Sequence, residues 1–183
     1  MFNQITIIGP GLLGTSLGMA IKAKGLAQRI NVWARRPEIR GACRLLDWCD
    51  AEHSDISEAV QESDFVVACT PVRHIENVLG EIARVAPSGC VVTDVGSVKG
   101  AICQAADKVF TASDAIFVGS HPMAGSEKAG MDNASPDLFE ERPCFVVSRK
   151  KVSLESLEIV SSFWQAIGMS VTISSPNEHD EIV

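Results

Sequence analysis

The chain has 183 residues, 46% hydrophobic and 21% charged, which is the composition of a globular domain with one well-buried core. Its net charge of −7 argues against a general nucleic-acid-binding surface. No apolar run approaches the roughly 18 residues of a membrane span, and the N-terminus leads almost directly into a strand-like run, so we expect a cytoplasmic protein without a signal peptide.

Short apolar runs alternate with helical patterns along most of the chain. The patterns predict strands at residues 5–8, 30–34, 65–69, 91–94, 116–119, 144–148 and 171–173, and helices at 13–24, 75–86, 99–110 and 154–167. Ser153 is expected to cap the start of the last helix, and Gly168 to end it. Strands alternating with helices indicate an α/β fold: a doubly wound, mostly parallel sheet covered on both faces.

The first predicted strand is followed by the sequence GPGLLG at 9–14, which opens the first helix. In this context Gly9 permits a tight turn, Gly11 lets the backbone approach a pyrophosphate, and Gly14 lets the helix pack close to the strand. Leu12 and Leu13 lie at the N-terminus of the predicted helix, where free N–H groups favour phosphates. The sequence therefore predicts a Rossmann-type dinucleotide-binding domain.

The end of the second predicted strand bears on the choice of dinucleotide. A fold that binds NAD places an acidic residue there for the ribose 2′-hydroxyl, whereas this chain has Ala34, Arg35 and Arg36. A guanidinium can hold a 2′-phosphate with paired charge-assisted hydrogen bonds. The pattern favours NADP. The alternative is NAD bound by other contacts, with both arginines in solvent.

Two further predicted strands end in polar residues. Thr70 and Pro71 follow the third, and Gly96 and Ser97 follow the fourth. Ligands in an open parallel sheet lie beyond the carboxyl ends of the strands, so these residues should border the nicotinamide. Ser97 either offers its hydroxyl at the reacting centre or caps the helix that begins near Lys99, and it could do both.

Residues 120–143 have no clean period, and long irregular segments in compact domains are usually functional. His121 lies at the start of this segment, just past the fifth predicted strand. Pro122 restricts the backbone before it and so limits where the imidazole points. Because the ordinary pKa of histidine is ~6.5, we take His121 as a candidate general base.

The six cysteines form neither a C-x-x-C pair nor a Cys/His cluster with zinc-ligand spacing, so no metal site is predicted. Free, buried thiols in a reducing compartment are expected. They are Cys43, Cys49, Cys69, Cys90, Cys103 and Cys144.

Four motifs together resemble the prephenate dehydrogenase family, which includes arogenate dehydrogenases. They are GPGLLGTSLG at 9–18, DVGSVK at 94–99, SHPMAGSEKAG at 120–130 and HDEIV at 179–183. The resemblance implies an NAD(P)-dependent oxidoreductase that decarboxylates prephenate or arogenate in tyrosine biosynthesis. It assigns His121 as the catalytic base and Ser97 as a residue that helps to orient the substrate hydroxyl and the histidine. Ser126 and Glu127 match loop positions near the mouth of the pocket, where ordinary solvation is the alternative.

Members of this family continue past HDEIV into a helical domain that dimerises and supplies cations for the substrate carboxylates. The resemblance therefore implies a cofactor domain at 1–175, the start of a connecting helix at 176–183, no helical domain in this chain, and a homodimer for the full-length protein. His179 is expected to lie in a disordered terminus. Lys99 and Lys128 are the only obvious cations near the crevice, and both could be solvated.

Two other functions stay open. One is a β-hydroxyacid dehydrogenase related to 6-phosphogluconate dehydrogenase, which shares the first motif but has no place for the SHPMAGSEKAG loop. The other is a module that binds NADP without turnover. Adding substrate separates an enzyme from a sensor, because only an enzyme forms NADPH.

Overall fold

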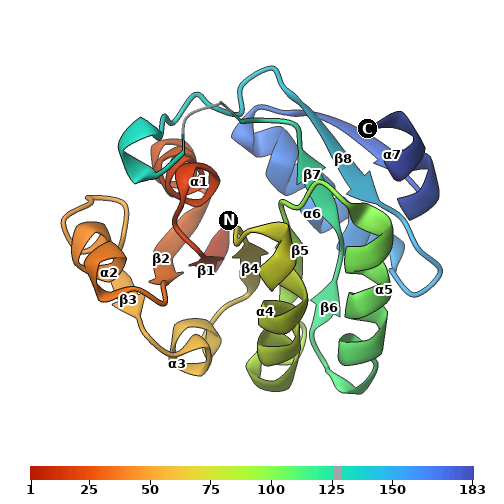
Figure 1. Cartoon of the computed structure of the whole chain (residues 1–183), viewed down its shortest axis with the longest axis horizontal. Helices are drawn as coiled ribbons and strands as arrows, with labels where there is room; N and C mark the ends of the chain where they lie inside the picture. Colours follow the sequence, from red (N-terminus) through yellow and green to blue (C-terminus); the bar gives the residue numbers. More distant parts are fainter. Residues whose placement is uncertain (126–128) are drawn as a thin grey trace.

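The computed structural model describes residues 1–125 and 129–183, and within them the strands form one sheet of six strands and one of three. Figure 1 shows their arrangement. The strands are β1 (Phe2–Ile8), β2 (Ala27–Trp33), β3 (Ala51–His53), β4 (Phe65–Ala68), β5 (Val91–Asp94), β6 (Ile116–Phe117), β7 (Ser120–Pro122), β8 (Pro143–Val147) and β9 (Ser170–Ser174). The helices are α1 (Leu12–Lys24), α2 (Pro37–Cys43), α3 (Ile56–Val60), α4 (Val72–Val85), α5 (Lys99–Val109), α6 (Leu154–Ile167) and α7 (Pro176–Ile182), with short 3₁₀ turns at Phe110–Ala112 and Met131–Asn133.

The larger sheet has the order β3-β2-β1-β4-β5-β6, and its neighbouring strands are parallel. The chain moves outward from β1 in one direction through β2 and β3, then returns to start again at β4. The carboxyl ends of β1 and β4 thus lie side by side at a topological switch point, where this fold binds ligands. The predicted Rossmann-type fold is confirmed.

Side chains along each strand point alternately to the two faces of the larger sheet, so a separate hydrophobic core forms on each face. In β1, Ile5 and Ile7 belong to one core, while Ile8 belongs to the other. The first core also holds the apolar faces of α1 and α6, and the second those of α3, α4 and α5. Ser153 and Gly168 bound α6 as predicted: the Ser153 side chain accepts from Ser156 N, and Gly168 is left-handed at φ 109°.

The sequence did not predict the second sheet, which has the order β7-β8-β9. The predicted fifth strand at 116–119 is shorter, because β6 ends at Phe117, and Ser120 starts β7, which pairs antiparallel with β8. The irregular segment therefore begins with a strand. Also missed were β3, α2 and α3, which have only three to seven residues and show too little of a period.

Buried polar contacts join the two sheets at the end of β5. The Asp94 carboxylate and the Lys99 ammonium form an ion pair with no exposed side-chain surface. Ser120 N donates to Asp94 Oδ1 (3.2 Å), and Lys99 Nζ donates to Ser120 O (2.6 Å). The Ser120 hydroxyl donates to Asp94 O (2.6 Å) and accepts from Trp164 Nε1 of α6 (2.9 Å). The first residue of β7 is thus held at its N–H, carbonyl and hydroxyl groups.

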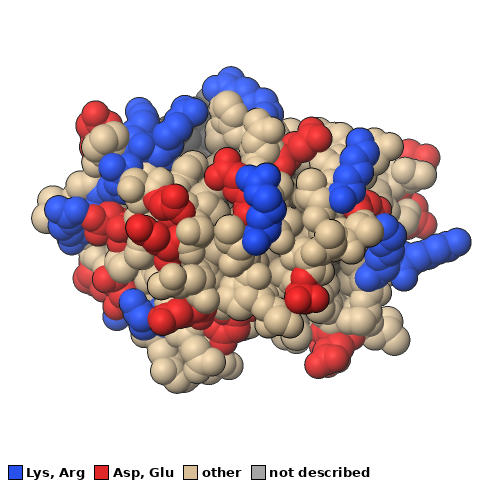
Figure 2. Space-filling view, turned by 90° about the horizontal axis from the view of Figure 1, so that it is seen from below, with Lys and Arg blue, Asp and Glu red and all other residues tan. Residues whose placement is uncertain are grey.

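The six cysteines are free, as predicted. Burial raises the pKa of every thiol, for example to about 11 at Cys43 and about 12 at Cys90. Acidic and basic side chains are intermixed on the face in Figure 2. Among the described residues, no helix is both long enough and apolar enough to cross a bilayer.

We expect Gly18→Ala to lower the free energy of unfolding by about 1–3 kcal/mol, the usual cost of overpacking. Gly18 of α1 lies under the ring of Trp48, which is 1% exposed, and an added Cβ would lie 2.6 Å from Trp48 Cδ2. Gly41→Ala in α2 is the matched control, because nothing lies within 4 Å of its added Cβ. The control should be neutral or stabilising by up to about 1 kcal/mol. Equal unfolding midpoints in urea for Gly18→Ala and the wild type would contradict this packing.

A second prediction concerns the buried ion pair. Lys99→Met should lower the free energy of unfolding by about 3–5 kcal/mol, because it leaves the Asp94 carboxylate buried without its cation. Arg29→Met serves as the control: it breaks the Arg29–Glu62 pair, whose side chains are 52% and 65% exposed, and should cost about 0–1 kcal/mol. Urea unfolding measures both. A similar small loss in both variants would contradict the importance of the buried pair.

Candidate active site at the carboxyl edge of the sheet

The turn after β1 is shaped by two close backbone approaches. Gly9 has φ +93°, and a Cβ there would lie 2.9 Å from Thr70 Cγ2, so only glycine fits. A Cβ on Gly14 would lie 2.5 Å from Gly9 O. The glycines therefore fold the loop tightly against the ends of β1 and β4, as the sequence motif indicates.

The start of α1 is suited to an anionic ligand. Gly11 is the N-cap residue and makes no side-chain cap, and nothing lies within 4 Å of the position that its Cβ would occupy. The N–H groups of Leu12 and Leu13 have no acceptor among the described residues. Free N–H groups and the positive end of the helix dipole favour phosphate oxygens. These residues fit the pyrophosphate of a dinucleotide.

Thr70 and Pro71 lie on the other side of the switch point. The Thr70 hydroxyl is buried, with no hydrogen-bond partner in the described chain, and Pro71 is the N-cap residue of α4. An unpaired buried hydroxyl beside Gly9 is a polar group that a bound ligand could satisfy. Both residues therefore border the switch point, and their contact with a cofactor stays a prediction.

The turn after β2 carries the arginines. Ala34 is buried, whereas Arg35 and Arg36 are exposed and form no ion pair with described residues. Arg40, which sequence reasoning missed, donates from Nη1 to Ala34 O (2.8 Å) and Arg35 O (3.0 Å). This contact fixes the backbone while both guanidinium groups stay free. In the sequence, the signal for this role of Arg40 was its position one turn into α2.

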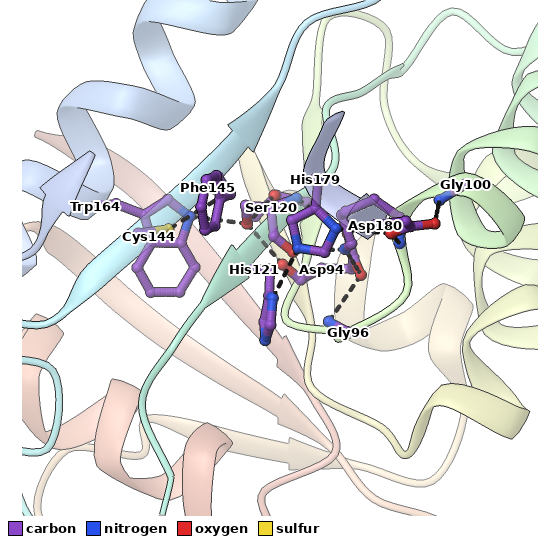
Figure 3. A network of polar contacts seen from close by, with 12 residues as sticks. Asp94, Gly96, Gly100, Ser120, His121, Cys144, Phe145, Trp164, His179 and Asp180 are labelled. Carbon is purple, nitrogen blue, oxygen red and sulfur yellow. Dashed lines mark hydrogen bonds and ion pairs between the residues drawn. The ribbon is translucent and has the colours of Figure 1, made fainter. Parts of the chain in front are cut away.

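His121 of β7 lies at the carboxyl edge of the larger sheet because its neighbour Ser120 is bound to Asp94 at the end of β5. The His121 ring joins a chain of contacts shown in Figure 3. His121 Nδ1 lies 2.9 Å from His179 Nε2, and His179 Nδ1 lies 2.7 Å from Asp180 Oδ1. The nitrogen of His121 that remains for a substrate is Nε2.

The environment of His121 changes its basicity. Burial, the nearby Lys99 ammonium and His179 lower the pKa of His121 to about 4, against the opposing effect of Asp180. The sequence alone had indicated an ordinary pKa. The imidazole is therefore neutral at pH 7 and can accept a hydrogen bond or a proton.

The prediction that His179 lies in a disordered terminus is wrong. Its side chain has no exposed surface, and its ring packs edge-on against Phe145 at 5.2 Å between centroids. The helix that carries it, α7, starts with a capping box between Ser175 and Glu178. This S-x-x-E pattern, with Pro176 at the first helical position, was the signal for an ordered helix.

Asp180, which sequence reasoning also missed, caps α5. Its carboxylate accepts from Lys99 N and Gly100 N, each at 2.8 Å.

Val98, not Ser97, is the N-cap residue of α5, and it makes no side-chain cap, so the capping alternative for Ser97 is wrong. Ser97 is exposed, and no hydrogen bond joins it to His121 in the described chain. Its role at the reacting centre stays a prediction.

The remaining predicted site residues differ in what the structure says of them. Gly96 is buried, and its N–H donates to Asp94 Oδ2 (2.9 Å), so that donor is already engaged within the protein. Lys99 is fully buried and is not a solvated cation. Ser126, Glu127 and Lys128 lie outside the described residues.

Comparisons with known proteins place the chain in a family. The family model described as "Prephenate dehydrogenase, nucleotide-binding domain" matches residues 17–173. Cyclohexadienyl dehydrogenase of Zymomonas mobilis is 29% identical over 183 residues, covering 100% of this chain and 62% of that protein. Prephenate dehydrogenase of Bacillus subtilis is 32% identical and is covered to 49% of its length, again by 100% of this chain.

Solved structures show the same likeness. Prephenate dehydrogenase from Aquifex aeolicus, in complex with hydroxyphenyl propionate and NAD⁺, superposes with a TM-score of 0.91 at 26% identity, covering 100% of this chain and 63% of that one. Synechocystis arogenate dehydrogenase gives 0.90 at 27% identity, covering 98% and 62%. The chain thus spans about half to three-fifths of these relatives, and over that span it belongs to the family of prephenate dehydrogenase nucleotide-binding domains.

Proposed function

We propose that the protein binds NADP through this domain and oxidises prephenate or arogenate with loss of CO₂, giving 4-hydroxyphenylpyruvate or tyrosine in tyrosine biosynthesis. One observation carries the proposal: the neutral His121 ring is held at the carboxyl edge of the sheet, the edge that also carries the phosphate-binding turn. Family membership favours this chemistry over the β-hydroxyacid alternative. A homodimer and a cytoplasmic location stay predictions.

The residues of this chain have separate parts in the proposed reaction. The N–H groups of Leu12 and Leu13 hold the pyrophosphate, and Arg35 and Arg36 hold the 2′-phosphate of the ribose. When bound, the nicotinamide supplies a hydride acceptor. His121 accepts the proton of the substrate hydroxyl, which makes the carbinol carbon a better hydride donor. Aromatisation of the ring drives the loss of CO₂.

We expect NADP to bind more tightly than NAD, because no acidic residue follows β2 and two exposed arginines do. Losing an arginine–phosphate contact costs about 1.5–3 kcal/mol, so Arg35→Ala or Arg36→Ala should weaken NADP roughly 10- to 100-fold and leave NAD unchanged. Arg29→Ala, at the opposite end of β2, should alter neither. Calorimetric titration of both cofactors measures this. Equal binding of NAD by the wild type, with neither variant weakening NADP, would contradict the proposal.

In the full-length protein, His121→Asn should lower kcat by roughly 10²–10⁴-fold, the usual contribution of a positioned base, and leave cofactor affinity unchanged. The pH profile gives the second readout. Because the pKa of His121 is about 4, the neutral ring persists as pH falls from 7, so wild-type kcat/KM should fall only as pH approaches about 4.

The measurement is reduced-nicotinamide absorbance with prephenate or arogenate as substrate, and the acidic limb should be absent from the His121→Asn profile. A variant with near-normal kcat would rule out His121 as the base. Binding of NADP without turnover of either substrate by the full-length wild type would point instead to a non-catalytic module.

A further inference from the structure

We propose that His179 and Asp180 are positioning residues for His121, and that together they hold the His121 ring in the tautomer that carries its proton on Nδ1. The argument follows the direction of each hydrogen bond along the chain of contacts in Figure 3.

Asp180 determines the direction of the hydrogen bond between its carboxylate and His179. Its Oδ1 accepts from Lys99 N and its Oδ2 from Gly100 N, so both oxygens already act as acceptors at the start of α5. An ionised carboxylate can only accept. Burial acts to raise the pKa of Asp180, but hydrogen bonds from His179 and from the two N–H groups outweigh it and hold the pKa below its usual value. At neutral pH, His179 Nδ1 must therefore be the donor to Asp180.

The position of the proton on His179 then determines the direction of the hydrogen bond between the two rings. A neutral imidazole with its proton on Nδ1 has only an acceptor at Nε2. The 2.9 Å contact between His179 Nε2 and His121 Nδ1 consequently needs the proton on His121 Nδ1. His121 Nε2 is left with its lone pair free, which is the state that a proton acceptor requires.

The surroundings of the His179 ring disfavour the reverse arrangement, in which the proton of each ring lies on Nε2. The His179 side chain has no exposed surface, so water cannot replace a lost partner. The Lys99 ammonium, whose positive charge acts on the His121 ring, is held in place by Asp94 and Ser120 O. Phe145 packs edge-on against the His179 ring and limits its rotation.

The first test reads the tautomer itself and needs no substrate. Two-dimensional ¹⁵N–¹H NMR of the imidazole rings distinguishes a proton on Nδ1 from one on Nε2. In the wild type we expect Nδ1–H for both His121 and His179. In His179→Phe, which keeps an aromatic ring against Phe145, the Nε2–H form of His121 should gain. Asp180→Ala should have the same effect and serves as a second route if His179→Phe does not fold.

Glu178→Ala is the matched control, because it breaks the capping box of α7 without touching the chain of contacts. It should destabilise α7 and leave the His121 tautomer unchanged. A wild-type His121 with its proton on Nε2 would overturn the inference. So would an unchanged Nδ1–H tautomer in the folded variants.

The second test rests on the proposed function. His179→Phe and Asp180→Ala should lower kcat roughly 10- to 10²-fold, as expected when a reacting group is misplaced, with KM changed less than kcat and Glu178→Ala near the wild type. Equal kcat in His179→Phe, Asp180→Ala and the control would overturn the positioning role. If the tautomers are as expected but the full-length wild type turns over neither substrate, the proposed function fails and the inference stands.

Discussion

The site depends on the hydrogen bonds that the buried carboxylate of Asp94 accepts. It accepts from Gly96 N, Lys99 Nζ and Ser120 N, and all three of these residues are buried. In such surroundings a satisfied polar network fixes one geometry, because each alternative leaves a polar group unpaired. Asp94 thereby sets the path of the chain after β5 and ties the smaller sheet to the larger one. The position of His121 follows from that tie.

The two halves of the site are specified in different ways. The half around the glycine turn is local: the turn after β1 and the helix that follows come from one stretch of sequence, and its glycines contact residues nearby in the chain or just after β4. The half that contains His121 is assembled from three segments far apart in the sequence, at 94–100, 120–121 and 179–180. Each segment completes hydrogen bonds of another, so none of them has this geometry by itself.

This difference explains what could be predicted from the sequence. The strand-turn-helix signal around Gly9 has a local physical cause, and the same holds for the cap at Ser153, so both were predictable. Burial of His179 depends on a partner 58 residues away, and capping by Asp180 on a helix start 80 residues away. No periodicity records such distances. The second sheet escaped prediction for the same reason, since β7 pairs with β8 across the irregular segment.

The double use of Asp180 couples two parts of the site. Its carboxylate caps α5 through Lys99 N and Gly100 N, and its Oδ1 also contacts His179, the partner of His121. A local opening that moves α7 away from α5 therefore removes the cap of α5 and the partner of His121 in a single event. Hydrogen exchange at the amides of Lys99 and Gly100 and loss of the His121–His179 contact are then expected to share one opening free energy.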